Sequence, residues 1–596
     1  MRGARWKAAR GDVVALLSLL TFHLAAALAL PLAGDVPLGD AAHYAWSARH
    51  WIETGELRIS DWPAMSLVGQ LWLALPLARV FGPGPAVLGG ATFALAAITA
   101  VLLYALLRSR GADAFCAWLA TSALGANPIW LAQSVTFDTE VYFLFFTLAG
   151  LLALARWELR RRPWQLGLAC AAIAYAGLIR QHALVLSLGA GVLWWRTSRE
   201  RRFPLWPWAL PVAVLAGYYL WLSEVHGLSK EVTSRQAFLA ERALRPWTAA
   251  WPLFSDLTAS VHYLGLFLLP LLGLASGGQS GAAAGGARRN ALAALALVAL
   301  ATLALALGSH PFSHERLMPY VPNIATLGAF VRPVASRLPE WVEPRRVQLV
   351  LTLVSGLAGA ALLRRAGVAA AAWSNPFDAL LLFSALLLVC FGALTGSVSF
   401  DRYFLVPFAL LLPVLAPRLR LTRRGALVAG SLLALEAGLA LTFVDQRIRV
   451  RRCPWELASG LVARGIPHRS IDAGFEFNTY YNYDYYSKRY GRELERPWEP
   501  RDAPEAEWVL SLVPRAEGPL ELLEVHECPN RRGLDPIPLW VYAVRPPQEP
   551  GTPGRPGEGA GPAAGGAPRT PGRRRGPRAP RRSACAGPRR GATLGA

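Results

Sequence analysis

The sequence predicts an all-α polytopic membrane protein with a small extracytoplasmic α/β domain and a disordered tail at its C-terminal end. Three observations lead to this fold class. Of the 596 residues 54% are hydrophobic, only 17% are charged, and long apolar runs alternate with short basic clusters. This composition has more apolar surface than a water-soluble fold usually buries. It excludes a disordered chain and a disulfide-rich secreted module.

The apolar runs approach the length that a membrane helix requires. A helix needs about 20 mostly apolar residues to cross roughly 30 Å of hydrocarbon, and about thirteen runs qualify. The predicted spans are 13–33, 85–107, 114–132, 139–155, 164–180, 182–195, 206–223, 259–275, 291–308, 347–363, 376–396, 403–416 and 426–444. The first run could also be a signal peptide, but it is long for one and many spans follow it. We therefore expect it to remain as a first membrane helix.

Basic clusters between the spans predict the orientation of the chain. Lys and Arg are enriched in cytoplasmic loops, and with a cytoplasmic N-terminus every alternate loop is basic. The clusters are Arg2/Arg5/Lys7/Arg10, Arg108/Arg110, Arg156/Arg160/Arg161/Arg162, Arg196/Arg199/Arg201/Arg202, Arg288/Arg289, Arg364/Arg365 and Arg418/Arg420/Arg423/Arg424. With the Arg-rich tail they account for the net charge of +22, so no nucleic-acid partner is expected. The odd span count places the chain after 444 outside the cytoplasm.

The domain plan has a transmembrane part, 1–444, and two further segments. Within the first outer loop, 34–84, DAAHYAWSARHWIETG and AMSLVGQLWLALPLARVFG are predicted to be amphipathic helices on the membrane surface. Residues 445–546 are predicted to form a small extracytoplasmic mixed domain with strands, built from IDAGFEFNTYYNYDYYSKRYG, EWVLSLVP and PLWVYAV. The aromatic run YYNYDYY is expected to be a strand that packs a small sheet, although its tyrosines could also stack on sugar rings. Residues 547–596 are rich in Pro, Gly, Ala and Arg, which predicts disorder.

The six cysteines are scattered, without a CxxC pair. Cys453 and Cys528 both fall in the predicted outer domain, where a disulfide is chemically permitted. Cys116, Cys170 and Cys390 fall inside predicted spans, where cysteine usually serves as a packing residue.

Ionisable residues gather at the outer ends of several predicted spans. Charges near a bilayer are costly, so such clusters are candidate sites. They are Asp40 and His43 after the first span, Asp138 and Glu140 after the third, Arg180 and His182 after the fifth, and Asp401, Arg402 and Tyr403 after the eleventh. All four loops lie on the same side of the predicted topology, so we expect one shared cavity. Such a set suits a reaction in which arginine binds a phosphate and a carboxylate takes a proton from a hydroxyl or amine.

The motifs in these loops resemble those of a known family. GDAAHYAWSARHWIETGEL after the first span, FDTEVYF at the fourth, the later DRYFLVP and the trailing soluble domain are similar to the GT-C class of membrane glycosyltransferases. Within it the likeness is to the bacterial protein-mannosyltransferase and aminoarabinose-transferase group. The resemblance implies a GT-C-like fold in the cytoplasmic (inner) membrane. It also implies transfer of a hexosyl or pentosyl unit from a polyprenyl-phosphate carrier to a lipid, protein or polysaccharide acceptor on the outer face.

The resemblance also suggests roles for individual residues. The essential acid of the family's first loop corresponds to Asp40, and the acid of its second loop corresponds to Asp138. We expect Asp40 to act as a base in an inverting displacement while Arg180 or Arg402 binds the departing lipid phosphate. The other substrate-binding candidates are Glu140, His182, Asp401 and Tyr403. Many relatives carry two adjacent acids in the first loop, whereas Ala41 follows Asp40 here. This speaks against a metal in that loop and leaves a divalent cation open.

Simpler roles and other functions stay open at this point. Asp40 and Asp138 could merely cap the helices that follow them. Arg402 could form an interfacial ion pair with Asp401, and Arg180 could be a snorkelling side chain. A metal site at His310, His314 and Glu315 would lack a distant ligand. A flippase of lipid-linked saccharide is the main rival function, although the internal repeats of a carrier are not evident. A non-catalytic envelope assembly protein is a further alternative.

Overall fold

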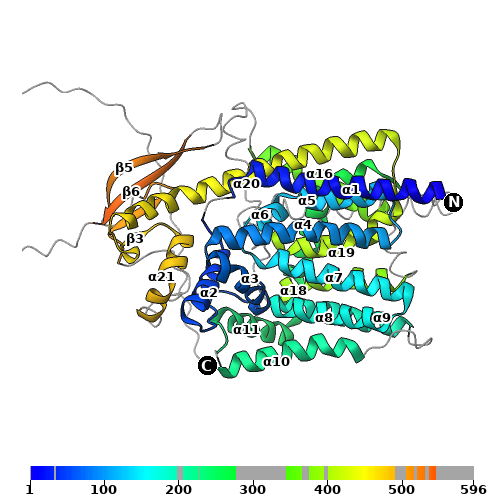
Figure 1. Cartoon of the computed structure of the whole chain (residues 1–596), viewed down its shortest axis with the longest axis horizontal. Helices are drawn as coiled ribbons and strands as arrows, with labels where there is room; N and C mark the ends of the chain where they lie inside the picture. Colours follow the sequence, from blue (N-terminus) through cyan, green and yellow to red (C-terminus); the bar gives the residue numbers. More distant parts are fainter. Residues whose placement is uncertain are drawn as a thin grey trace, which may run out of the picture. The chain divides into compact units, whose positions relative to one another are not determined.

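The chain is described by a computed structural model (Figure 1). It describes residues 2–32, 35–197, 206–225, 227–276, 344–365, 375–394, 401–489, 505–515, 520–530 and 536–544. The chain divides into two compact units, Met1–Arg545 and Pro546–Ala596, and every described residue belongs to the first. Several predicted features lie outside the described residues. They are the span 291–308, the cluster Arg288/Arg289, the candidate metal ligands His310, His314 and Glu315, and the tail 547–596.

The first unit is mostly helical, as predicted. Its helices are α1 (Arg2–Ala29), α2 (Ala41–Thr54), α3 (Val68–Phe81), α4 (Pro85–Ser109), α5 (Ala114–Gly125), α6 (Pro128–Ser134), α7 (Thr139–Arg160), α8 (Pro163–Ile179), α9 (Leu184–Thr197), α10 (Ala209–Val225), α11 (Lys230–Leu244), α12 (Ala250–Phe267), α16 (Pro344–Arg365), α18 (Pro376–Leu394), α19 (Leu405–Leu415), α20 (Arg423–Ala463) and α21 (Phe475–Arg489). Both segments predicted as helices in the first outer loop are helical, as α2 and α3.

Among the described residues, four helices are long and apolar enough to cross a membrane. They are Arg10–Ala29, Pro85–Ser109, Thr139–Arg160 and Arg423–Ala463. Shorter apolar helices accompany them at Val68–Phe81, Ala114–Gly125, Pro163–Ile179, Ala209–Val225, Val350–Arg364 and Pro376–Gly392. These helices indicate a membrane protein, while the count of thirteen spans stays a prediction.

Several predicted spans have different boundaries in the structure. The predicted span 259–275 covers only the second half of α12 and continues over η5 (Leu269–Gly273) and β1 (Ala275–Ser276). The run 114–132 is not one helix, because α5 ends at Gly125 and α6 begins at Pro128. Proline has no amide hydrogen and favours the first turn of a helix. Asn127 caps α6 by accepting hydrogen bonds from the amides of Ile129, at 2.8 Å, and Trp130. The last predicted span instead continues without a break, since α20 extends through position 444 to Ala463.

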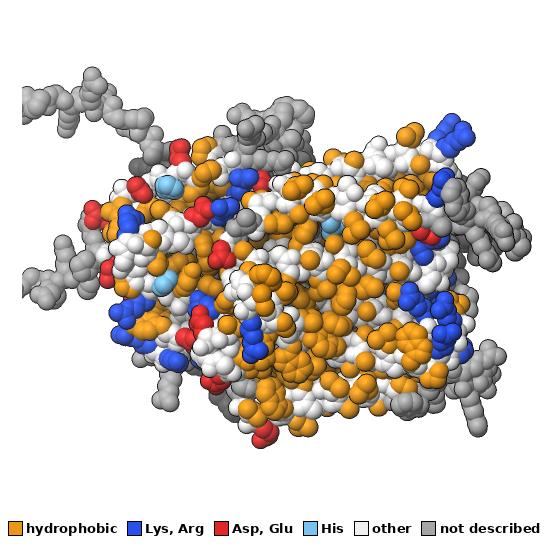
Figure 2. Space-filling model, in the orientation of Figure 1, with side chains coloured by type: hydrophobic (Ala, Val, Ile, Leu, Met, Phe, Trp, Pro, Cys, Tyr) orange, Lys and Arg blue, Asp and Glu red, His pale blue; other side chains and the backbone are white. Residues whose placement is uncertain are grey.

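Charged residues from several predicted cytoplasmic loops meet at one end of the helices. Arg108 pairs with Asp12 at 2.7 Å, and Arg110 contacts Glu158 at 3.2 Å and Asp378 at 3.1 Å. Figure 2 shows Lys and Arg gathered at this end, near the N-terminus, and a broad apolar surface over the middle of the visible face. Arg418, from another predicted cytoplasmic cluster, also pairs with Asp378. Arg110 and Arg418 therefore lie on a common side of the helices, as the alternation of basic loops predicts for these two clusters.

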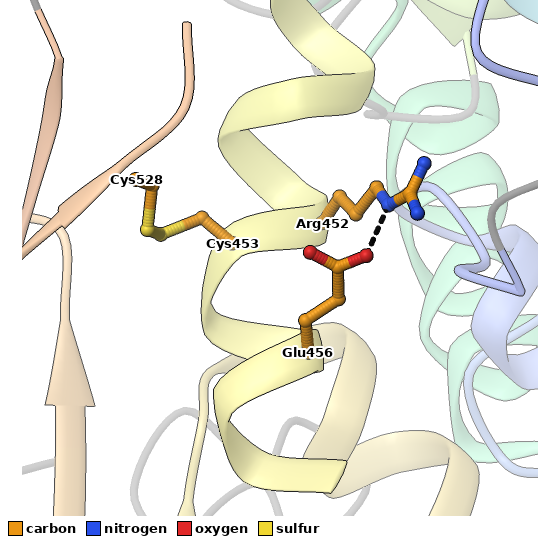
Figure 3. The surroundings of a disulfide bond; sticks show 4 residues. All are labelled: Arg452, Cys453, Glu456 and Cys528. Carbon is orange, nitrogen blue, oxygen red and sulfur yellow. Dashed lines mark hydrogen bonds and ion pairs between the residues drawn. A yellow bond between two sulfur atoms is a disulfide. The ribbon is translucent and has the colours of Figure 1, made fainter. Parts of the chain in front are cut away.

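The C-terminal part of the first unit contains a four-stranded sheet and α21. The strands β3 (Ile471–Asp472), β4 (Trp508–Ser511), β6 (Ile537–Val544) and β5 (Leu520–Cys528) lie in that order. β3 is parallel to β4, and the other two pairs are antiparallel. A disulfide between Cys453 of α20 and Cys528 of β5 joins the sheet to the long helix (Figure 3). This is the pairing that the sequence permits, and Cys116 and Cys170 are buried in helices, as expected.

The aromatic run FEFNTYYNYDYYSKR forms α21, so the strand interpretation of this segment is wrong. Its buried aromatic residues are Phe477, Tyr480, Tyr483 and Tyr486. Three residues correspond to a rotation of about 300°, so these four side chains are spread over one half of the helix circumference, and neighbouring elements cover that half. Intervening Tyr residues raise the strand propensity of the segment, but burial of this face decides its structure.

Candidate active site

The candidate residues lie where four segments meet at the other end of the helices. Asp40 directly precedes α2, Asp138 directly precedes α7, Arg180 follows α8, and Arg402 lies in the short helix η6 (Asp401–Phe404). Two backbone amides before Asp40 are bound by side chains from distant segments. The backbone amide of Leu38 donates a hydrogen bond to Thr136 Oγ1 at 3.2 Å. The backbone amide of Gly39 donates one to Glu476 Oε1 of α21 at 3.2 Å. The shared site expected from the topology therefore has a geometric basis.

Arg402 is the centre of the cluster. Its guanidinium forms ion pairs with Asp40, with Asp138 at 3.3 Å and with Glu140 at 3.4 Å. The Arg402 side chain is only 6% exposed, so these pairs are largely shielded from water. Arg402 is thus more than an interfacial anchor for the next helix. The side chain of Asp401 lies outside the described atoms.

Arg180 is the second buried arginine of the site. It forms an ion pair with Glu140 and donates to Thr139 Oγ1 at 3.2 Å. Its side chain is 5% exposed, which contradicts the snorkelling alternative. The ring of Tyr403 lies 5.3 Å from Cζ of Arg180 and 5.7 Å from Cζ of Arg402. The two arginines and the tyrosine therefore form one contiguous group.

The two aspartates differ in their helix-capping roles. Asp138 accepts a hydrogen bond from the Thr139 amide at 2.8 Å and so caps α7, in addition to its contact with Arg402. Asp40 occupies the cap position of α2 but makes no capping hydrogen bond through its side chain. Its Oδ1 instead accepts from Nε1 of Trp62 at 3.1 Å, and its Oδ2 pairs with Arg402. The capping alternative is therefore wrong for Asp40 and correct, although incomplete, for Asp138.

The surroundings of the two aspartates shift their pKa values in opposite directions. Burial acts to raise the pKa of Asp40, but the charge of Arg402 and hydrogen bonds from Arg402 and Trp62 hold this pKa below its ordinary value. Burial, and next the negative charge of Glu140, raise the pKa of Asp138 well above its ordinary value. At neutral pH, Asp40 is consequently ionised and able to accept a proton, whereas the environment of Asp138 favours the protonated acid.

A cavity of about 350 Å³ lies beside the cluster. One part of its lining is polar and consists of Glu140, Arg180, Gln181, His182, Arg235, Gln236, Asp256, Arg402 and Tyr403. The apolar part comes mainly from α10, α11 and α18, through Val212, Leu215, Ala216, Val232, Leu239, Leu388 and Val389. Asp40 and Asp138 are not among the lining residues, and Arg402 contacts both of them as well as lining the cavity.

His182 belongs to the cavity wall and not to the carboxylate cluster. It lies in the short helix η1 (Gln181–Ala183), and its ring centroid is 4.9 Å from that of Phe391 and 6.4 Å from that of Tyr403. Among the described residues no group of three or more His, Cys, Asp or Glu could hold a metal ion.

Three further residues of this region were not expected from the sequence. Trp62 contacts Asp40, Glu476 binds the turn before it, and Arg235 adds a third arginine to the cavity. Arg235 lies on α11, a helix with apolar and charged faces, and such a helix next to predicted spans was a signal that could have been used. For Trp62 and Glu476 the sequence offers no comparable signal, since their roles depend on contacts between distant segments.

The chain is similar to solved structures of two glycosyltransferases. No protein-family model and no curated protein matches it. ArnT from Cupriavidus metallidurans, bound to undecaprenyl phosphate, matches 89% of this chain and 98% of its own at 13% identity and a TM-score of 0.42; its apo structure matches similarly, at 15% identity and 0.41. The S. cerevisiae protein O-mannosyltransferase Pmt1–Pmt2 complex, bound to the sugar donor, matches 37% of this chain and 35% of its own at 16% identity and 0.28. An aminoarabinose transferase and a protein O-mannosyltransferase, both of the GT-C class, are thus among the structures to which this chain is similar, as its sequence motifs predict.

Proposed function

We propose that the protein is a membrane glycosyltransferase that moves a sugar from a polyprenyl-phosphate carrier to an envelope acceptor. One observation carries this proposal. A carboxylate whose pKa is held low, Asp40, shares Arg402 with a cavity whose walls are otherwise largely apolar. A lipid phosphate ester that must react with a hydroxyl or amine needs this combination of an apolar wall, a cation and a base.

The cavity suits the carrier lipid. Its walls from α10, α11 and α18 can bind isoprenoid chain, while Arg180 and Arg402 face the same space and can bind the phosphate. Guanidinium groups bind phosphate oxygens with two parallel hydrogen bonds. Both arginines are already oriented by carboxylates, so the phosphate meets fixed donors. His182, Tyr403 and Arg235 line the same cavity, and we propose that they contact the phosphate or the sugar.

The transfer is proposed to be a single inverting displacement at the anomeric carbon. The acceptor oxygen or nitrogen forms a bond to that carbon, and the bond from the carbon to the phosphate oxygen breaks. The electron pair leaves with the phosphate, whose growing negative charge Arg180 and Arg402 stabilise. The acceptor proton moves to the Asp40 carboxylate. No covalent sugar–enzyme intermediate is needed, so paired carboxylates at glycosidase spacing are not required.

The other carboxyl groups support this arrangement. Asp138 caps α7 and contacts Arg402, and we propose that it acts as the second acid of the site by orienting that guanidinium. Glu140 lines the cavity and pairs with both arginines, which supports a role for it in binding the sugar. Asp401 is proposed to bind substrate from η6. A divalent cation is left open.

The proposed topology has the N-terminus in the cytoplasm and the site on the outer face of the cytoplasmic membrane. The alternation of basic loops supports it, and so does the disulfide, because disulfides persist mainly in extracytoplasmic compartments. In the proposed domain plan, residues 1–444 form the transmembrane part, 445–546 an extracytoplasmic domain and 547–596 a disordered tail. The acceptor is proposed to be a lipid, protein or polysaccharide of the envelope.

The test is deletion of the gene in its host, followed by mass spectrometry of lipid-linked sugars and envelope glycans. The proposal predicts that carrier-bound sugar accumulates on the outer face and that one envelope glycan is lost. Wild-type protein should restore the glycan, whereas Asp40→Asn, inserted at equal level, should not. Carrier-bound sugar trapped on the cytoplasmic face would indicate a flippase instead. Full restoration by Asp40→Asn would show that Asp40 is not the base.

A further inference from the structure

The carboxylate of Asp40 is bound by two donors of different kinds. Arg402 pairs with Oδ2, while the indole N–H of Trp62 donates to Oδ1 at 3.1 Å. Arg402 also forms ion pairs with Asp138 and Glu140, and it lines the cavity. A guanidinium with so many partners cannot by itself select one orientation of the Asp40 carboxyl plane. The second donor fixes that plane, because each oxygen then has its own partner.

Trp62 is itself held in place by aromatic rings on two sides. Its ring is stacked with His43, with centroids 5.5 Å apart and planes within 6° of each other, and it lies 5.4 Å from the ring of Phe475. His43 is fully buried, and its Nδ1 forms a hydrogen bond with Ser60 Oγ at 3.0 Å. Burial lowers the pKa of His43 to about 3, against the opposing effect of Asp40, so the stacked ring is neutral. The stack therefore contributes packing and no charge.

The helix α21 supports this stack from the C-terminal part of the chain. The ring of Tyr483 lies 5.5 Å from that of His43, edge to face, and its hydroxyl accepts from the Asp61 amide at 2.8 Å. Phe475, at the start of α21, contacts both His43 and Trp62. The segment that carries Trp62 is thus clamped between α2 and α21.

We propose that Trp62 is a positioning residue for the transfer reaction, which orients the Asp40 carboxylate, and that α21 contributes to the site by fixing the Trp62 indole. This inference rests on the proposed function of Asp40. It gives the C-terminal part of the chain a role at the site, because α21 influences the orientation of the proposed base through Trp62. Trp62 does not exchange a proton or contact the anomeric carbon; it acts only through Asp40.

The variant Trp62→Phe removes the donor and keeps an aromatic ring for the stack. Loss of one hydrogen bond to a charged group predicts that kcat falls roughly ten- to hundred-fold. KM for the carrier lipid should change less than about two-fold, because Trp62 does not line the cavity. Trp62→His, which restores a ring N–H, should recover part of kcat. Trp164→Phe is the matched control, since this tryptophan is exposed at the far end of α8 and should leave kcat unchanged.

A pH profile separates positioning from packing. Trp62 donates to the ionised form of Asp40, so its removal raises the pKa of Asp40 and shifts the acidic limb of the kcat profile to higher pH. The charged and titratable groups that face Asp40 are Arg402, His43, Asp138 and Glu140, and Arg447 and Glu476 lie at the neighbouring Gly39. All of them stay in place in Trp62→Phe. The Phe475→Leu variant should cause a smaller shift in the same direction, because it loosens the indole without removing it.

The outcomes distinguish this inference from the proposed function. If Asp40→Asn abolishes transfer while Trp62→Phe keeps both the wild-type kcat and the acidic limb, the positioning role is refuted and the proposed function stands. A lower kcat with an unmoved acidic limb would assign Trp62 to packing and would also refute it. If Asp40→Asn transfers sugar normally, the proposed function itself fails. Should Trp62→Phe not insert into the membrane, Phe475→Leu and Trp62→His provide the same readouts.

Discussion

Replacement of Arg402 by glutamine removes the cation on which three acidic side chains converge. Arg402 is 6% exposed, and Asp138 and Glu140 are each 2% exposed. Removing one partner of a buried ion pair leaves an uncompensated charge and typically costs about 3–5 kcal/mol. We therefore expect Arg402→Gln to lower the free energy of unfolding by about that amount. The double variant Asp40→Asn/Arg402→Gln should recover part of the loss, because it removes a negative charge together with the positive one.

The stability of these variants can be followed in detergent by thermal unfolding with a thiol-reactive dye. Cys116 and Cys170 are buried, so their thiols react when the helices separate. Arg452→Gln is the matched control: Arg452 and Glu456 are 37% and 55% exposed and form an i,i+4 pair, for which a loss of only about 0.3–0.5 kcal/mol is expected. If Arg402→Gln unfolds like this control, the reasoning that one buried guanidinium organises the site is refuted.

Four further predictions concern other parts of the chain. Arg235→Gln should raise KM for the carrier lipid several-fold with little change in kcat, as measured by steady-state kinetics, because Arg235 lines the cavity away from Asp40; a fall in kcat alone would contradict this placement. The rate of transfer should stay constant as the pH falls from 7 to about 5, since the pKa of Asp40 is held low by Arg402 and the base stays ionised; an acidic limb near pH 6 would contradict an ionised Asp40. Cys453→Ser should lower the free energy of unfolding by about 2–4 kcal/mol and make thermal unfolding insensitive to reductant, whereas an unchanged response to reductant would argue against the disulfide. Gly359→Ala should destabilise the contact of α16 with α12 by about 1–3 kcal/mol, because its Cβ would overlap the carbonyl of Val261, while Gly430→Ala, which meets nothing within 4 Å, should be close to neutral.

The sequence predicts where the helices lie and which loops come together at the site. It does not predict which side chains pair within that site. The positions of α4, α7 and α8 follow from apolar runs, and the parity of the basic loops places Asp40, Asp138, Arg180 and Arg402 on one side. The structure brings these four together. The pairing within the group could not be predicted, because the acids that pair with Arg402 among the described side chains, Asp40, Asp138 and Glu140, lie far away along the chain.

The elements that were predicted wrongly show where helix caps and tertiary contacts override hydropathy and residue propensity. Hydropathy alone treats 114–132 as one run, although the pair Asn127 and Pro128 is a recognised helix start and divides it. The residues of α21 read as a strand because Tyr is common in strands, yet burial of one face against neighbouring elements makes them helical. Trp62 carries no charge and belongs to no motif, so its contact with Asp40 emerges only from the fold. In each case a tertiary contact or a cap decides between alternatives that hydropathy leaves equal.

Transfer by the purified protein tests the central claim most directly. Wild-type protein and Asp40→Asn would be reconstituted with the lipid-linked sugar that accumulates in the deletion strain, together with envelope acceptor from the same strain. Release of polyprenyl phosphate and formation of the glycosylated acceptor would be followed by mass spectrometry. We predict that the wild type releases both products in equal amounts and that Asp40→Asn is slower by about 10²–10⁴-fold, the contribution of a general base. Equal rates for the two proteins, or lipid-linked sugar left intact by the wild type, would contradict the account.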